Sequence, residues 1–229
     1  MLTKKKKLSK KEIKEDKLVT TFYEAKSYYE NNQTIIFAVV GAIAVIIFAV
    51  LFFTNKTKEN NQLASAALVS VVTDYNAGLY LQAIDGKEGT KEIGLLKIVD
   101  LYGGTKQGEL ARIILANAYF YTGQYDKAIE EFDDYSGDDD IMVASAIAGK
   151  AGCYEVKGEF EDAANSFLKA ANVSNYVPAN PDYLLNAGIN YIKVKNNGEA
   201  KIVLEKLKSD YSASAASKQV DKYLSLLKN

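Results

Sequence analysis

The second half of this chain repeats a set of residue types at a fixed spacing, and this repetition limits the folds that the chain can adopt. Tyr119, Gly123, Ala128 and Phe132 are followed, 35 residues later, by Tyr154, Gly158, Ala163 and Phe167. The residues between these positions differ between the two copies. A third copy, with Gly188, Tyr191, Ala200 and Leu204, follows after a longer step of 37 residues. A period in this range indicates stacked copies of one small structural unit.

Helix packing explains why these residue types are kept. Two antiparallel helices approach each other closely only where their contact residues are small, and aromatic side chains fill the space beside the contact. Glycine allows the positive φ that ends the first helix of each unit. The pattern therefore predicts an all-α fold, a solenoid in which each helical hairpin packs against the next. The residues assigned to this packing are Ala116, Tyr119, Gly123, Ala128, Phe132, Ala151, Tyr154, Gly158, Ala163, Phe167, Gly188, Tyr191, Ala200 and Leu204.

An apolar run, Ile35 to Phe53, lies near the N-terminus and contains no charged or amide side chain. As an α-helix of about 28 Å it matches the hydrocarbon thickness of a bilayer, and its side chains favour insertion by about −6 kcal/mol. A cleaved signal peptide is the main alternative, but the preceding segment is too long and the run exceeds the apolar region of a normal signal. We therefore predict one transmembrane helix over residues 35–53.

The segment before this run, residues 1–34, is basic, whereas the body of the chain is acidic. The nearest twenty residues on each side of the run hold two lysines each, so the near-window count does not decide the orientation. The basic character of the whole N-terminal segment, and the tendency of long domains after a span to translocate, predict a cytoplasmic N-terminus and a C-terminal body on the far side of the membrane. Ser9 to Glu12 fits a capping box, and an apolar stripe at Leu18, Phe22, Ala25 and Tyr29 predicts an amphipathic helix. That helix either lies on the inner leaflet or forms a simple juxtamembrane stalk, and the basic head either binds lipid or reaches a cytoplasmic regulator.

Beyond the run, composition divides the chain into further segments. Residues 54–62 are polar and are expected to form a short linker. Residues 63–104 resemble a degenerate first helical repeat, with one helix ending near Gly78, a loop around Gly86 and Gly89, and a second helix over Thr90 to Gly104. Residues 105–213 contain the three clear repeats, the last with its turn at Asn196–Gly198. Residues 214–229 are predicted to form a C-terminal capping helix, with Ala216, Val220, Tyr223, Leu224 and Leu227 on one face.

The composition argues against catalysis and nucleic-acid binding. The chain has no His and no Trp, one Cys (Cys153) and one Arg (Arg112), so a base–nucleophile pair, an internal disulfide and an arginine-rich reading surface are not expected. The acidic run Asp133 to Asp140 lacks the ligand spacing of an EF-hand and is expected to end one helix at Gly137 and cap the next with Asp138 to Asp140. We predict no enzyme activity, no metal site, no cofactor and no small-molecule substrate.

The clearest repeat resembles the tetratricopeptide repeat. The residues that carry this resemblance are Leu115, Ala116, Tyr119, Gly123, Tyr125, Ala128, Ile129 and Phe132. The family's Trp-like position is occupied by Arg112, Ile147 and Leu184 in the three copies, a departure from the signature. The resemblance implies a protein-interaction module that holds an extended peptide or a partner helix in its concave groove.

The first helix of each repeat would line that groove. The groove residues implied by the resemblance are Ile113, Asn117, Phe120, Tyr121, Gly152, Glu155, Leu185 and Ile189. This set is largely apolar and aromatic, and only Asn117 fits a clamp for a terminal carboxylate. A hydrophobic segment or a partner helix is therefore the expected ligand, although any one of these residues can instead serve packing between helices.

The whole layout has a narrower resemblance. A basic head, one membrane span and a tetratricopeptide body, together with the stretch Tyr102 to Ala111, are similar to the ancillary subunit of the SecYEG translocon and its bacterial relatives. This resemblance implies an inner-membrane anchor, repeats in the periplasm, and translocon subunits, periplasmic chaperones or an emerging polypeptide as partners. A structural scaffold of a cell-envelope complex that handles no client is the alternative.

Overall fold

The computed structural model describes residues 10–90 and 92–227. The chain divides into two compact units, Met1–Lys56 and Thr57–Asn229. The described residues of both units are helical apart from turns, loops and one isolated bridge between Gly86 and Ile93. The predicted all-α class is therefore confirmed for this part of the chain. Ser9 of the expected capping box lies outside the described residues.

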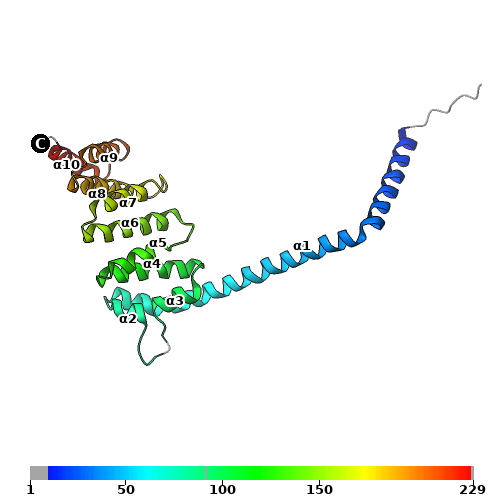
Figure 1. Ribbon diagram of the computed structural model, residues 1–229, viewed down its shortest axis with the longest axis horizontal. Coiled ribbons are helices and arrows are strands. Elements are labelled where there is room, and N and C mark those ends of the chain that lie inside the picture. The colour runs from blue at the N-terminus through cyan, green and yellow to red at the C-terminus, as the bar shows by residue number, and fades with distance from the viewer. Residues whose placement is uncertain (1–9, 91, 228–229) are drawn as a thin grey trace, which may run out of the picture. The chain divides into compact units, whose positions relative to one another are not determined.

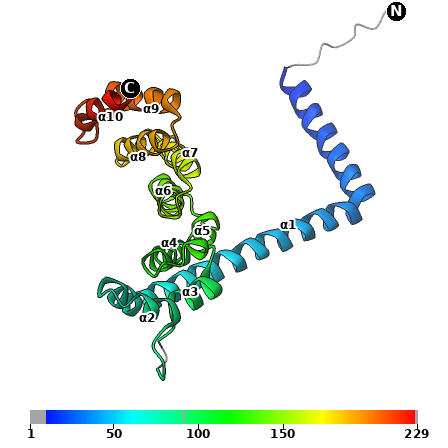
Figure 2. The same cartoon turned by 60° about the vertical axis from the view of Figure 1, so that its left-hand side comes forward.

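The first unit consists, where described, of the N-terminal part of α1 (Lys10–Asn76). The helix is interrupted at Asn32, where φ is −123° and ψ is 18°, and Figures 1 and 2 show α1 changing direction near its N-terminal end. The Asn32 side-chain amide nitrogen donates to the Tyr28 backbone carbonyl at 2.8 Å. This side-chain bond gives the Tyr28 carbonyl a hydrogen-bond partner at the break in the helix. The apolar run follows this break directly.

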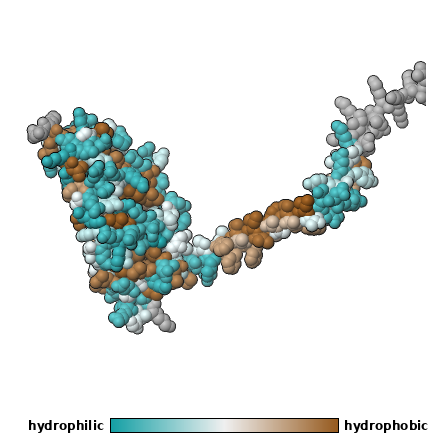
Figure 3. Space-filling view, in the orientation of Figure 1, coloured by the Kyte–Doolittle hydropathy of each residue, from teal (hydrophilic) through white to brown (hydrophobic). Residues whose placement is uncertain are grey.

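The apolar run forms a bare helix within the first unit. All of its large side chains except the half-buried Ile36 are exposed, and Figure 3 shows one hydrophobic band along this part of α1. In the described part of the chain, α1 is the one helix that is long and apolar enough to cross a membrane, judged by length and composition. No residue of its most apolar window is buried within the protein, which distinguishes it from a core helix.

The second unit starts inside α1 and continues as a series of shorter helices, each packed against the next in Figure 1. Their bounds are α2 (Tyr80–Asp85), α3 (Leu95–Tyr102), α4 (Lys106–Tyr121), α5 (Tyr125–Asp133), α6 (Asp140–Lys157), α7 (Phe160–Ala171), α8 (Asn180–Lys193), α9 (Asn197–Asp210), the 3₁₀ turn η1 (Ser217–Gln219) and α10 (Val220–Leu226). The pairs α4–α5, α6–α7 and α8–α9 are the three hairpins that the repeat predicted.

The turns of the three hairpins occupy equivalent positions, but the third uses a different residue. Gly123 and Gly158 adopt φ of 76° and 81°, and Lys195 adopts 61° at the matching place. The third turn was expected at Asn196–Gly198. Instead Asn196 caps α9, with its side chain accepting from the Glu199 N–H, and Gly198 lies in the first turn of that helix. The left-handed conformation at Lys195 costs about 1–2 kcal/mol relative to glycine.

Most of the residues assigned to packing lie in the core. The buried ones are Ala116, Tyr119, Ala128, Phe132, Ala151, Ala163, Phe167, Gly188, Tyr191, Ala200 and Leu204, whereas Tyr154 is half-buried. Gly188 matches Ala116 and Ala151 of the earlier repeats. A Cβ atom there would lie 2.7 Å from Leu204 side-chain atoms, because α8 and α9 approach more closely than alanine permits.

The N-terminal part of the second unit differs from expectation in three ways. Residues 54–62, expected as a linker, continue α1 without a break. The helix expected from Thr90 begins only at Leu95, because residues 86–90 and 92–94 lie outside any helix and the Lys87 N–H donates to the Glu92 carbonyl. The short helix α2, which the sequence did not predict, precedes these residues.

The C-terminal cap also differs in detail. Residues 214–229 were expected as one helix, but the described part contains η1 followed by the seven-residue α10. Ala216 and Val220 are buried against the last hairpin. Tyr223, Leu224 and Leu227 pack against the same cluster while half-buried. The apolar side of the expected cap is therefore the side that faces the core.

Candidate functional site

The predicted groove residues have very different accessibilities. Ile113 and Leu185 are 8% and 6% exposed and belong to the hydrophobic core, so their assignment to an open groove is wrong in this structure. Each lies on the buried side of its helix, where neighbouring helices cover it. Asn117, Phe120, Gly152, Glu155 and Ile189 are half-buried, and Tyr121 is 58% exposed. Tyr121 is therefore the predicted groove residue with the most surface available to a partner.

An aromatic cluster surrounds Tyr121 at the end of the first hairpin. It comprises Tyr75 of α1, Tyr80 of α2, Phe120 and Tyr121 of α4, and Tyr125 of α5. The Tyr80 and Tyr121 rings are stacked with their centroids 4.9 Å apart, and the Tyr75 ring lies 5.4 Å from the Tyr80 ring. Burial, together with the neighbouring Tyr121 and Tyr80, raises the pKa of Tyr75 to about 12. Tyr75 therefore stays neutral at physiological pH.

Exposed leucines extend this aromatic cluster into a surface patch. Leu79 and Leu81 flank Tyr80 and are both exposed. Residues 78–82 and Thr122 line a shallow hollow beside the cluster. Tyrosine is one of the residue types that contribute most to protein–protein binding energy, because its large, rigid ring buries much area at low entropic cost. Sequence reasoning included Phe120 and Tyr121 but missed Tyr75 and Tyr80, which only the fold brings to the same place.

Further along the repeats, an ion pair joins the second and third hairpins. The Lys193 ammonium of α8 lies 2.6 Å from the Glu155 carboxylate of α6 and 4.5 Å from the Phe160 ring centroid. The charge of Glu155, a predicted groove residue, is therefore held by a cation from the next repeat. An extended ligand would meet an aromatic surface at the first hairpin and a paired charge at the second and third.

A second hollow, of about 370 Å³, lies between the starts of α4 and α6. Its lining combines apolar Leu110, Tyr135 and Met142 with Lys106 and acidic residues of the α5–α6 loop. Asp139 of that loop accepts from the N–H groups of Ile141 and Met142, so the expected capping role is carried by one of the three aspartates. Helix α5 ends at Asp133, earlier than the predicted stop at Gly137. Among the described residues, no group of three or more His, Cys, Asp or Glu side chains could hold a metal ion.

The only arginine of the chain, Arg112, lies among acidic side chains of its own hairpin. Arg112 donates to the Glu131 carboxylate at 2.8 Å, and its guanidinium also lies 3.7 Å from Glu109 and from Asp134. Glu109 is buried and accepts the backbone N–H groups of Gly104 and Ser136. Arg112, at the Trp-like position of the repeat, therefore ties α4 to α5 through a partly buried charge network.

The single thiol is not available for chemistry. Cys153 is fully buried in α6, and burial raises its pKa to about 11. A thiol with this pKa carries almost no thiolate at neutral pH, and the thiolate is the nucleophilic form. Cys153 therefore acts as a small core residue, as its place beside the packing residues of the repeat suggests.

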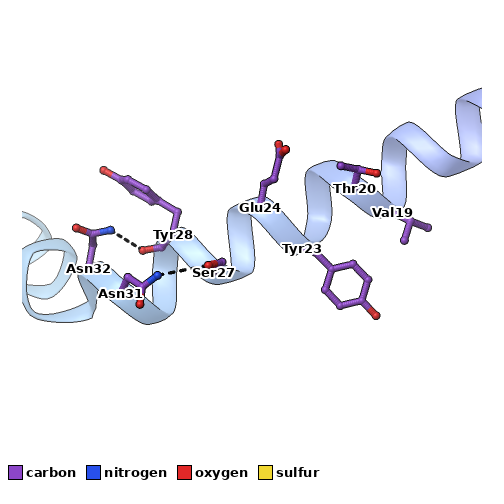
Figure 4. A pocket seen from close by; sticks show the side chains of 8 residues that line it. All are labelled: Val19, Thr20, Tyr23, Glu24, Ser27, Tyr28, Asn31 and Asn32. Carbon is purple, nitrogen blue, oxygen red and sulfur yellow. Dashed lines mark hydrogen bonds between the residues drawn. The ribbon is translucent and has the colours of Figure 1, made fainter.

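The side of α1 between Val19 and Asn32 carries a shallow hollow of its own (Figure 4). All of its lining residues come from this single helix. Figure 4 shows Val19 and Tyr23 pointing to one side of the helix and Glu24 and Tyr28 to another. Among the residues that the structure describes, no second element encloses the hollow, so it is a surface contour of one helix and not a ligand cavity.

Comparison with known proteins agrees with this geometry. A family model described as a tetratricopeptide repeat-like domain matches residues 26–178. No curated protein matches the chain. Two crystal structures of nearly identical TPR-like repeats from a putative kinesin light chain of Podosopora anserina, one of them a point variant, are similar in fold.

The two crystal structures support the fold alone. Each is 14% identical to this chain with a TM-score of 0.51, and the alignments cover 75% of this chain and 84% or 85% of theirs. The family model covers well over half of the sequence, and it includes the two repeats in which the residue pattern is clearest. This chain therefore belongs to the tetratricopeptide repeat-like family.

Proposed function

We propose that this chain is a single-pass membrane protein whose repeat solenoid binds other polypeptides as an accessory factor of the Sec translocon. Its solenoid docks periplasmic chaperones or emerging polypeptides. The N-terminus lies in the cytoplasm, the apolar run crosses the bacterial inner membrane, and the solenoid lies in the periplasm. The resemblance of the whole layout to the ancillary translocon subunit supports this assignment.

The observation that carries the proposal is the bare apolar helix over residues 35–53. Its large side chains are exposed apart from the half-buried Ile36, and no residue of its most apolar window is fully buried by the protein. Thirteen exposed aliphatic and aromatic side chains in water would cost far more than a folded domain gains, whereas a bilayer removes that cost. A membrane is the solvent in which this helix is stable.

The solenoid supplies the binding function. Tetratricopeptide-like solenoids are typically interaction scaffolds without catalytic activity, and they bind proteins or peptides. The aromatic cluster around Tyr121, with its exposed leucines, is the part of the surface best suited to an apolar segment of a partner. The Glu155–Lys193 pair then gives the same surface a polar boundary that limits how an apolar segment can extend.

Site-specific crosslinking in intact cells tests this proposal. Photoreactive side chains at Asn117, Tyr121 or Glu155 are expected to capture translocon subunits, periplasmic chaperones or nascent chains, with the highest yield at the exposed Tyr121. The control is Glu130, which is exposed on the second helix of the same hairpin and should give little product. Capture of one fixed set of envelope components, with no chaperone, nascent chain or translocon subunit, would contradict the proposal and favour a scaffold.

A further inference from the structure

The first arm of α1, residues 10–31 before the break at Asn32, has an apolar stripe that no other described element of its unit covers. Leu18, Phe22, Ala25 and Tyr29 are spaced by four, three and four residues, which places them on one side of an α-helix. Leu18, Phe22 and Tyr29 are 67%, 65% and 44% exposed. The described part of this unit contains only α1, so no second helix of the unit packs on the stripe.

The stripe is continuous with the apolar run. The Tyr29 ring, the last member of the stripe, lies 6.4 Å from the Phe37 ring in an edge-to-face arrangement, and these two residues stand on opposite sides of the break at Asn32. Apolar surface therefore passes from the first arm into the run without a polar gap on that side. The break changes the direction of the helix at the place where a membrane span would begin.

The chemistry of the arm fits the bilayer–water interface. Leu18 precedes the apolar run by 17 residues, so it lies within about 26 Å of the run along the helix. Phe22, Tyr23, Tyr28 and Tyr29 are of the types enriched at membrane interfaces. The five lysines of residues 10–31 are balanced by five acidic residues, so apolar contact and not net charge would hold the arm there.

We infer that residues 10–31 form a helix that lies in the bilayer–water interface, with the stripe of Leu18, Phe22, Ala25 and Tyr29 turned toward the acyl chains. The inference rests on the proposed membrane anchoring, because the span holds the arm against the lipid surface. The stripe is buried about 5–10 Å into the boundary between headgroups and acyl chains, as for other interfacial helices. The break at Asn32 joins the interfacial arm to the span.

The absence of tryptophan from this chain provides a direct test. Three single-tryptophan variants of the full chain are compared in phosphatidylcholine vesicles: Phe22→Trp on the stripe, Ser27→Trp about 140° around the helix, and Phe48→Trp in the apolar run. The emission of Phe22→Trp is expected to be blue-shifted relative to Ser27→Trp and to be quenched by lipids brominated at shallow acyl positions. High salt should leave that shift unchanged, because phosphatidylcholine carries no net charge and apolar contact holds the arm.

The three variants separate failure of the inference from failure of the proposed function. Quenching of Phe48→Trp by deeply brominated lipids reports insertion of the span. If Phe48→Trp is quenched while Phe22→Trp emits like a water-exposed indole, the arm is a stalk or a protein-binding helix and the inference is wrong. Equal quenching of Phe22→Trp and Ser27→Trp would contradict the orientation of the stripe. If Phe48→Trp is unquenched, the membrane anchoring itself fails.

Discussion

Replacement of Gly108 by alanine is expected to destabilise the solenoid by about 3 kcal/mol or more, the upper end of the range for overpacking. Gly108 lies in the first turn of α4, where a Cβ atom would overlap the carbonyl group of Tyr102 at the end of α3. Backbone atoms cannot rotate away as a side chain can. A shift of α4 would also stretch the bond in which Thr105 Oγ1 accepts the Gly108 N–H at 3.0 Å.

Gly198→Ala is the matched control, because Gly198 also occupies the first turn of a helix. Its added Cβ would meet only the Asn196 side chain at 4.0 Å. The substitution should stabilise α9 by about 0.5–1 kcal/mol through the lower conformational entropy of the unfolded chain. Urea unfolding of the full chain in detergent, followed by circular dichroism, measures both. Equal unfolding midpoints for Gly108→Ala and the parent would show that α3 and α4 do not approach as closely as described.

Removal of the guanidinium by Arg112→Met is expected to cost about 3–5 kcal/mol, because Glu109 and Glu131 are then left partly buried without a cation. Their side chains are only 6% and 19% exposed. The double variant Arg112→Met/Glu131→Leu should recover a large part of the loss, since it removes one of the unpaired charges and adds apolar contact. A double variant no more stable than Arg112→Met would show that the Glu131 charge does not cause the loss.

The pH dependence of stability is a second test of the charge network around Arg112. Burial raises the pKa of Glu131 above its usual value, and Arg112 opposes that shift. A carboxyl group with a raised pKa in the folded state binds more protons when folded than when unfolded, so its contribution to stability grows as pH falls toward its unfolded pKa. Without Arg112 the shift is larger. The deficit of Arg112→Met relative to the parent should therefore shrink as the pH is lowered through that window.

The repeat architecture follows from local rules and could be predicted from sequence. Two features could be assigned without ambiguity, because the nearest helix contact or turn requires each of them. They are the small residues at Ala116 and Ala151 and the positive φ at Gly123 and Gly158. The third turn was misplaced, since Lys195 adopts the left-handed conformation without being a glycine. The step of 37 residues from Gly158 leads to Lys195, but the prediction followed the residue type to Gly198, and a lysine gives no local signal for a positive φ.

The binding surface could be predicted only in part, because accessibility depends on neighbouring helices. Ile113 and Leu185 have the apolar character expected of a groove, but the same character suits the core in which they lie. The aromatic cluster joins Tyr75, Tyr80 and Tyr121 across segments far apart in sequence, and the Glu155–Lys193 pair joins two repeats. Repeat spacing identifies equivalent positions, but it carries no information on contacts made through the degenerate first repeat.

Extraction of cell membranes with alkaline carbonate tests the central claim, that the apolar run holds the solenoid at a bilayer. The parent chain is expected to remain in the membrane pellet. The variant Ile43→Lys/Ile47→Lys should move to the soluble fraction, because two lysines at the helix centre cost about 3 kcal/mol each and cancel the insertion energy of about −6 kcal/mol. Recovery of the parent chain in the soluble fraction, at the same level as this variant, would contradict the account.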